Sequence, residues 1–189
     1  MLRSLLLCLS IMLSPAVLAE EATLPNPQVV IKTSEGDITL RLFRDKSPVT
    51  VDNFLNYADS GFYNGTIFHR VISNFMIQGG GFTADMAQKA TGDPIVNESK
   101  NRLQNTRGTI AMARTNDPDS ATSQFFINQR SNLKLDWAPG REGYTVFGEV
   151  ILGMDIVDFI ASAPTGKSGQ FSDVPVETIT IKEIVRYEP

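Results

Sequence analysis

Residues 68–80 read FHRVISNFMIQGG, which is two short apolar runs divided by a Ser-Asn pair and closed by two glycines. Runs rich in Val, Ile and Phe, bounded by Gly, Asn and Ser, are typical of short strands joined by turns. Further runs of this kind follow at 109–113, 125–128 and 146–150, separated by Gly, Asn, Asp and Pro. The pattern therefore predicts a mainly β protein built from short strands.

The two ends of this pattern show the alternation that a half-buried strand requires. Residues 29–33 and 38–42 alternate on either side of a Ser-Glu-Gly-Asp turn, which predicts a hairpin. Near the C-terminus the alternation runs through Ile179 and Ile181 and changes phase at Glu183, which predicts either a β-bulge or an exit from pairing.

Two segments have the periodicity of amphipathic helices instead. In residues 48–60 apolar side chains recur at the i, i+3, i+4 and i+7 spacing of one helix face. We expect Ser47 to act as the N-cap, Pro48 to occupy the first helical position and Gly61 to end the helix. A second helix is expected over residues 154–161, shortly before a proline.

The predicted elements are about eight short strands and two helices, and the strands do not alternate regularly with helices. That order argues against a doubly wound parallel sheet. We expect a closed eight-stranded antiparallel β-barrel capped by two α-helices, because closure leaves no exposed sheet edge.

Composition narrows the class of function. The 189 residues, of which 42% are hydrophobic and 20% charged, have the composition of one globular domain. The net charge of −4 argues against a nucleic-acid partner. One Cys excludes a disulfide framework and a cysteine-rich zinc site, and we expect neither a metal nor a cofactor.

The N-terminal segment differs from the rest of the chain. Arg3 precedes an apolar run over residues 5–13 that is too short to cross a bilayer as a helix, and a small residue follows at the expected cleavage position. We interpret residues 1–19 as a signal peptide, 20–28 as a flexible leader and 29–187 as the folded domain. A buried core helix is the alternative interpretation of the apolar run.

Two motifs resemble the cyclophilin family of peptidyl-prolyl cis-trans isomerases. One is F-H-R-x-I-x-x-F-M-x-Q-G-G over residues 68–80, and the other is S-Q-F-F-I at 123–127 after G-T-I-A-M-A at 108–113. The resemblance extends over residues 29–187. The export signal and the Met-Ala-Arg-Thr sequence resemble the bacterial periplasmic branch, which implies a periplasmic protein that is free of the membrane after cleavage.

The resemblance implies roles for ten residues. Arg70 is implied to be catalytic, and Gln78 to hold a substrate carbonyl and to orient Arg70. The other eight are implied to bind substrate, as walls of a proline pocket or as a groove for the peptide main chain; they are Phe75, Met76, Ala113, Arg114, Gln124, Phe126, Leu135 and Tyr144. The implied partners are proline-containing unfolded or folding polypeptides, bound by a monomer.

The resemblance also bears on inhibition by cyclosporin. Lys134 stands where cyclosporin-sensitive members have a tryptophan, so weak binding is expected. Trp137 lies in the longer loop at 136–143 and is not a simple replacement.

The residue types suit this reaction on chemical grounds. Rotation about an Xaa–Pro bond breaks no covalent bond, but amide resonance sets a barrier of roughly 18–20 kcal/mol. A fixed donor at the imide nitrogen, beside an apolar wall, stabilises the twisted amide more than either planar state. Arg70 provides such a donor, and its guanidinium stays charged.

Two other functions would use the same residues differently. A proline-binding or chaperone module would hold peptides in this groove with incidental turnover. A serine hydrolase would need His69 as the base for a serine such as Ser123, but no G-x-S-x-G sequence is present. We expect His69 to be structural, because neighbouring residues on a strand face opposite sides and Arg70 faces the site.

Overall fold

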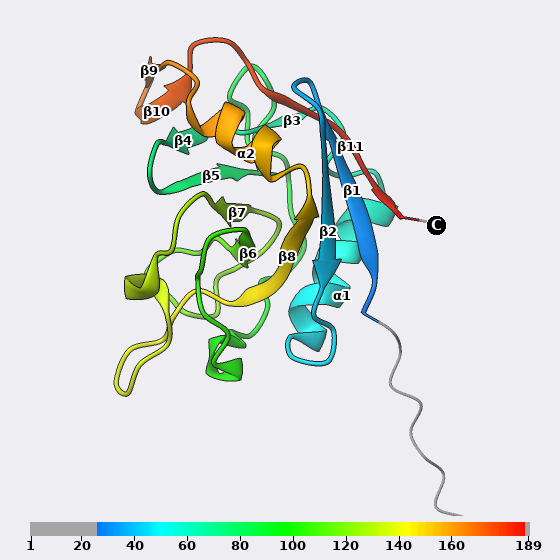
Figure 1. The fold of residues 1–189 in the computed structure, drawn as a ribbon, viewed down its shortest axis with the longest axis vertical. Helices are drawn as coiled ribbons and strands as arrows, with labels where there is room; N and C mark the ends of the chain where they lie inside the picture. Colours follow the sequence, from blue (N-terminus) through cyan, green and yellow to red (C-terminus); the bar gives the residue numbers. More distant parts are fainter. Residues whose placement is uncertain (1–25, 188–189) are drawn as a thin grey trace, which may run out of the picture.

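The computed structural model describes residues 26–187, and its main element is one antiparallel sheet of nine strands (Figure 1). In spatial order the strands are β3 (Thr66–Ile67), β11 (Thr180–Arg186), β1 (Gln28–Thr33), β2 (Asp37–Leu42), β8 (Val146–Leu152), β6 (Thr109–Met112), β7 (Phe125–Asn128), β5 (Met76–Gly79) and β4 (Arg70–Ile72). A separate hairpin pairs β9 (Thr165–Ser168) with β10 (Phe171–Pro175).

The two edge strands of the large sheet are neighbours in the chain, so the sheet curls back towards itself. Only two residues separate β3 from β4. The Ile67 N–H donates to the Phe82 carbonyl at 2.9 Å and Thr66 pairs with Thr83, which joins β3 to the chain that leaves β5. The predicted mainly β, antiparallel barrel architecture with two helices is confirmed.

The strand count differs from the predicted eight. The run at 67–72 forms two strands, because its first part pairs with β11 and its last part pairs with β5. The β9–β10 hairpin was not predicted, because residues 165–175 carry mostly Gly, Lys, Ser, Gln and Asp where a typical strand alternates apolar side chains.

The pairings of β1 with its two neighbours confirm two predictions. β1 pairs with β2 in the predicted N-terminal hairpin and with β11 on its other side. The register with β11 places Lys32 opposite Glu183 but Thr33 opposite Ile181, which confirms the predicted bulge in the last strand.

The N-terminal boundary of the domain differs slightly from the prediction. Residues 1–25, which include the predicted signal peptide and most of the predicted leader, lie outside the described residues. The end of that leader belongs to the fold, since the Pro27 carbonyl accepts a hydrogen bond from the Leu42 N–H at 2.8 Å and Gln28 begins β1. Pairing with β2 therefore extends beyond the apolar pattern from which the boundary was predicted.

Both helices form where the periodicity predicts them, and they lie apart in Figure 1. α1 (Pro48–Asp59) packs against β11, and α2 (Met154–Ala161) packs against β2, β4 and β5. The buried helix side chains are Thr50, Val51, Phe54, Leu55 and Ala58 in α1 and Val157, Ile160 and Ala161 in α2. The face predicted for α1 is the face that it buries.

Aromatic rings form the centre of the main core. The Phe54 ring on α1 lies 5.3 Å from Tyr63, 5.6 Å from Phe125 and 5.2 Å from Phe147, measured between ring centres. Tilted and edge-to-face pairs at these distances are favourable beyond the area that they bury. Because Phe125 belongs to β7, this cluster fixes the position of β7.

The N-terminus of α1 is capped differently from the prediction. Ser47 stands at the N-cap position, but it is fully buried and its hydroxyl donates to the Val146 carbonyl at 2.9 Å. The Glu98 carboxylate instead accepts the N–H groups of Thr50 at 2.8 Å and Val49 at 3.2 Å. A carboxylate at this position also suits the positive end of the helix dipole.

Replacing Glu98 tests this cap. We expect Glu98→Ala to lower the free energy of unfolding by about 1–2 kcal/mol, because two helix N–H groups lose a charged acceptor. Urea unfolding measures the change as a lower midpoint at constant slope. Glu177→Ala removes an exposed carboxylate and serves as the control; equal midpoints for the two variants would contradict the capping role.

Candidate active site

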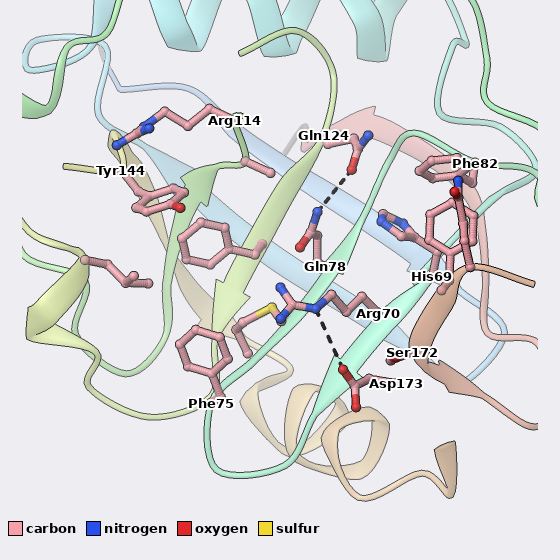
Figure 2. A pocket seen from close by; sticks show the side chains of 16 residues that line it. His69, Arg70, Phe75, Gln78, Phe82, Arg114, Gln124, Tyr144, Ser172 and Asp173 are labelled. Atoms are coloured by element: carbon pink, nitrogen blue, oxygen red, sulfur yellow. Dashed lines mark hydrogen bonds and ion pairs between the residues drawn. The ribbon is translucent and has the colours of Figure 1, made fainter. Parts of the chain in front are cut away.

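The outer face of β4, β5 and β7 borders a cavity of about 540 Å³ (Figure 2). Side chains from distant parts of the chain converge there. All ten residues with an implied role line this cavity: Arg70, Phe75, Met76, Gln78, Ala113, Arg114, Gln124, Phe126, Leu135 and Tyr144.

Strand register places the polar and apolar parts of the cavity in one row. Arg70 lies opposite Gln78 across β4 and β5, and Gln78 lies opposite Phe126 across β5 and β7. Residues directly opposed in an antiparallel sheet point to the same face. The alternate residues Val71 and Ile77 point the other way and belong to the main core.

The apolar end of the cavity is a cluster separate from the main core. Met76 and Phe126 are only 2% and 4% exposed, and Phe75, Leu135 and Tyr144 pack against them. The rings of Phe126 and Tyr144 meet edge to face, with centres 5.7 Å apart and planes at 76°. Aromatic and thioether walls of this kind suit a small flat ring.

The Arg114 side chain holds Tyr144 in this wall. Its guanidinium lies 4.6 Å from the centre of the Tyr144 ring, within cation–π range. The same group donates to the carbonyls of Thr115 and Glu142 at 2.8 Å and of Gly143 at 3.2 Å. The sequence resemblance implied a main-chain role for Arg114, and the structure gives its side chain a positioning contact as well.

Two glutamines form the polar rim of the cavity. Gln78 Nε2 donates to Gln124 Oε1 at 3.0 Å (Figure 2), and the Gln124 carbonyl accepts the Ala113 N–H at 3.0 Å. A Cβ at Gly81 would collide with the Gln124 side chain, so only glycine leaves room for this arrangement. The rim is therefore fixed by both side-chain and backbone contacts.

The Arg70 guanidinium lies between the apolar cluster and the β9–β10 hairpin (Figure 2). Its Nε lies 4.0 Å from Asp173 Oδ2, and the Arg70 side chain is 43% exposed. The resemblance implied that Gln78 orients Arg70. The contact of Gln78 with Gln124 uses only the donor of the Gln78 amide, so this role stays a prediction, and in the described part of the chain Asp173 is the ion-pair partner of Arg70.

Sequence reasoning missed one wall of the cavity. Its residues are Phe82, Gln170, Phe171, Ser172 and Asp173. Four of them belong to the β9–β10 hairpin or its turn, for which the only sequence signal is one aromatic residue in a polar segment. That residue, Phe171, packs on Phe82 with ring centres 5.1 Å apart.

His69 borders the cavity, whereas the prediction placed it on the opposite face from Arg70. Strand alternation does not apply there, because His69 lies in the bend between β3 and β4. It is 4% exposed and its ring centre lies 4.6 Å from that of Phe82. Burial, and secondarily the charge of Arg70, lowers the pKa of His69 to about 4.

The serine hydrolase alternative does not fit this geometry. Ser123 is fully buried and does not line the cavity. Within the described residues its hydroxyl has no hydrogen-bond partner, so it is not paired with His69 as a nucleophile with its base would be.

The side chains of the cavity do not form a metal-binding group. The residues that line the cavity include one imidazole, that of His69, and one carboxylate, that of Asp173. Across residues 26–187, no three His, Cys, Asp or Glu side chains gather as metal ligands would. No helix in that range is long and apolar enough to cross a bilayer.

Sequence and fold are both similar to those of known proteins. A family profile described as "Cyclophilin type peptidyl-prolyl cis-trans isomerase/CLD" matches residues 28–186. The chain is 54% identical over 158 residues to a peptidyl-prolyl cis-trans isomerase of Acinetobacter baylyi, which covers 84% of each chain. It is 55% identical over 160 residues to peptidyl-prolyl cis-trans isomerase B of Escherichia coli, which covers 82% of this chain and 97% of the other.

A solved structure gives the same result for the fold. The crystal structure of a cyclophilin type peptidyl-prolyl cis-trans isomerase of Cryptosporidium parvum, in the presence of the dipeptide Ala-Pro, matches with a TM-score of 0.73. The identity is 31%, over 86% of this chain and 99% of that chain.

The pKa of His69 predicts a pH dependence of stability. Between pH 6.5 and about 4 the unfolded chain protonates His69 while the folded chain does not. The free energy of unfolding is therefore not reduced by His69 above pH 6.5. It falls as the pH drops from 6.5 towards 4, by up to about 1.4 kcal/mol per pH unit. Chemical unfolding of wild type and His69→Gln at pH 5 to 7 should show a shallower slope for the variant; parallel slopes would contradict the assignment.

Proposed function

The chain belongs to the cyclophilin family of peptidyl-prolyl cis-trans isomerases, and from that premise we propose that Arg70 stabilises the twisted amide of an Xaa–Pro bond while the apolar cluster holds the proline ring. The observation that carries the proposal is the row formed by Arg70, Gln78 and Phe126 in one cavity. The mechanism needs no nucleophile, metal or proton transfer.

The charge on Arg70 acts selectively on the transition state. In either planar isomer the nitrogen lone pair is delocalised into the carbonyl, whereas at the twisted geometry it is localised and accepts a hydrogen bond. A donor that acts only on the twisted form lowers the barrier without tightening ground-state binding. Arginine suits this role because it presents several N–H donors in a planar group that does not deprotonate.

The apolar cluster provides binding that is common to both isomers. Phe75, Met76 and Leu135 form a wall with the edge-to-face pair of Phe126 and Tyr144. Burial of a proline ring against these side chains fixes one side of the rotating bond. The rest of the peptide can then turn about that bond.

The amide rim is suited to the main chain of an extended peptide. Gln78 and Gln124 already share one hydrogen bond, so each amide is oriented before substrate arrives. Side-chain amides carry both donors and acceptors, which match peptide C=O and N–H groups whatever the sequence. The substrates that we propose are proline-containing unfolded or folding chains.

We also propose that the protein acts on exported chains in the periplasm. The support is the sequence of residues 1–19, with Arg3 before an apolar run of signal-peptide length. A folding catalyst there would meet chains that arrive unfolded and isomerise slowly, over tens of seconds without catalysis.

Replacement of Arg70 tests the mechanism. We expect Arg70→Ala to lower kcat by roughly 10²–10³-fold, equivalent to about 2.7–4 kcal/mol of transition-state stabilisation, with KM changed little. Arg70→Lys should restore activity only in part, because an ammonium lacks the planar array of donors. Rates of cis–trans relaxation of a proline tetrapeptide measure both variants.

Phe126→Ala provides the contrast for that experiment. It removes a wall of the pocket, so we expect it to weaken peptide binding and turnover together. Circular dichroism establishes that each variant is folded. A folded Arg70→Ala protein that isomerises the peptide at the wild-type rate would show that Arg70 is not the catalytic group and that the proposed mechanism is wrong.

Position 134 predicts weak inhibition by cyclosporin. Lys134 lies exposed on the short helix Leu133–Leu135, and Trp137 is directed to a separate depression, where the Arg102 guanidinium lies 5.6 Å from its ring centre. We expect Lys134→Trp to tighten cyclosporin binding, by an amount on the order of a few kcal/mol, because an indole adds flat contact area and an N–H donor. Titration of isomerase activity measures this; tight inhibition of the wild type would be the opposite result.

A further inference from the structure

We propose that Asp173 is a positioning residue for Arg70, and that the β9–β10 hairpin brings it to the active site for this purpose. The inference rests on the proposed role of Arg70 and adds to it the group that orients the guanidinium.

The β9–β10 hairpin packs against the strand that carries Arg70. β10 packs beside β4, on which Arg70 stands. The Phe171 ring anchors the hairpin, with its centre 5.1 Å from that of Phe82 and 6.5 Å from that of His69. Asp173 follows two residues later and directs its carboxylate towards Arg70 (Figure 2).

The ion pair uses one edge of the guanidinium. Asp173 Oδ2 faces Arg70 Nε at 4.0 Å, so the two terminal amino groups remain available on the side of the apolar cluster. This separation is that of an ion pair rather than a hydrogen bond, and catalytic hydrogen bonds are often long before substrate binds. The Arg70 side chain is 43% exposed, so a nearby negative charge can select among its rotamers.

The backbone at Asp173 is specialised. Its φ is +61°, in the left-handed region that most residues avoid and that Asp, Asn and Gly tolerate. This conformation occurs inside β10, where the pairing with β9 is irregular between Phe171 and Val174. Three consecutive residues of β10, Phe171, Ser172 and Asp173, line the cavity, which the irregular pairing permits and a regular strand, with its two-residue period, would not.

Two substitutions separate the charge from the backbone requirement. Asp173→Asn keeps the shape and removes the charge, and Asp173→Gly keeps the left-handed conformation and removes the side chain. We expect kcat to fall about fivefold in Asp173→Gly, the upper range for an exposed ion pair, and by less in Asp173→Asn, with KM unchanged in both. Asp93→Asn, an exposed aspartate outside the cavity, is the matched control and should match wild type.

The double variant Arg70→Ala, Asp173→Gly makes the test specific. If Asp173 acts through Arg70, Asp173→Gly causes no further loss once Arg70 is alanine, with residual rates measured at raised enzyme concentration. An equal loss in both backgrounds, or a change in KM that depends on the charge of the residue before proline, would overturn the inference. So would wild-type kcat in Asp173→Gly while Arg70→Ala is inactive, and that result would leave the proposed role of Arg70 intact.

Discussion

The alternation of side chains along β7 is the constraint on which both the core and the active site depend. Phe125 packs on Phe54 in the main core, and its neighbour Phe126 forms part of the apolar cluster that lines the cavity. On β5 the same rule sends Ile77 into the core and Gln78 into the cavity. A slip of one residue in register would exchange the two faces. The register that buries the core side chains of these strands is therefore also the register that places the cavity side chains.

The active site has a rigid half and an adjustable half. On the apolar side Phe126 is almost fully buried, and Tyr144 is held between it and the Arg114 guanidinium. On the polar side Arg70 and Asp173 are both partly exposed. This division suits the proposed mechanism, in which the proline ring stays still while the Arg70 donor follows a nitrogen whose geometry changes.

How well the sequence predicts this site depends on how far apart in the chain the contacting residues lie. The lining residues at 70–78 and 113–126, with Leu135 and Tyr144, were predictable through the family resemblance, because the two motifs that carry it lie on or beside adjacent strands. The Glu98 cap and the Asp173 wall were not, because each depends on a segment that folds back from a distant part of the chain. His69 was misplaced for a related reason, since the bend between β3 and β4 is set by their different partners.

The position of β1 between β2 and β11 has a consequence for how the chain folds. The first strand of the domain completes its hydrogen bonds only when the last one, residues 180–186, is available. At about 5–20 residues per second, synthesis of the intervening chain takes on the order of ten seconds. That interval reaches the shorter end of the time of uncatalysed Xaa–Pro rotation, so a fraction of the ten Xaa–Pro bonds of this chain can isomerise before the sheet forms. The newly made chain thus presents Xaa–Pro bonds, the type of bond on which the cyclophilin family acts.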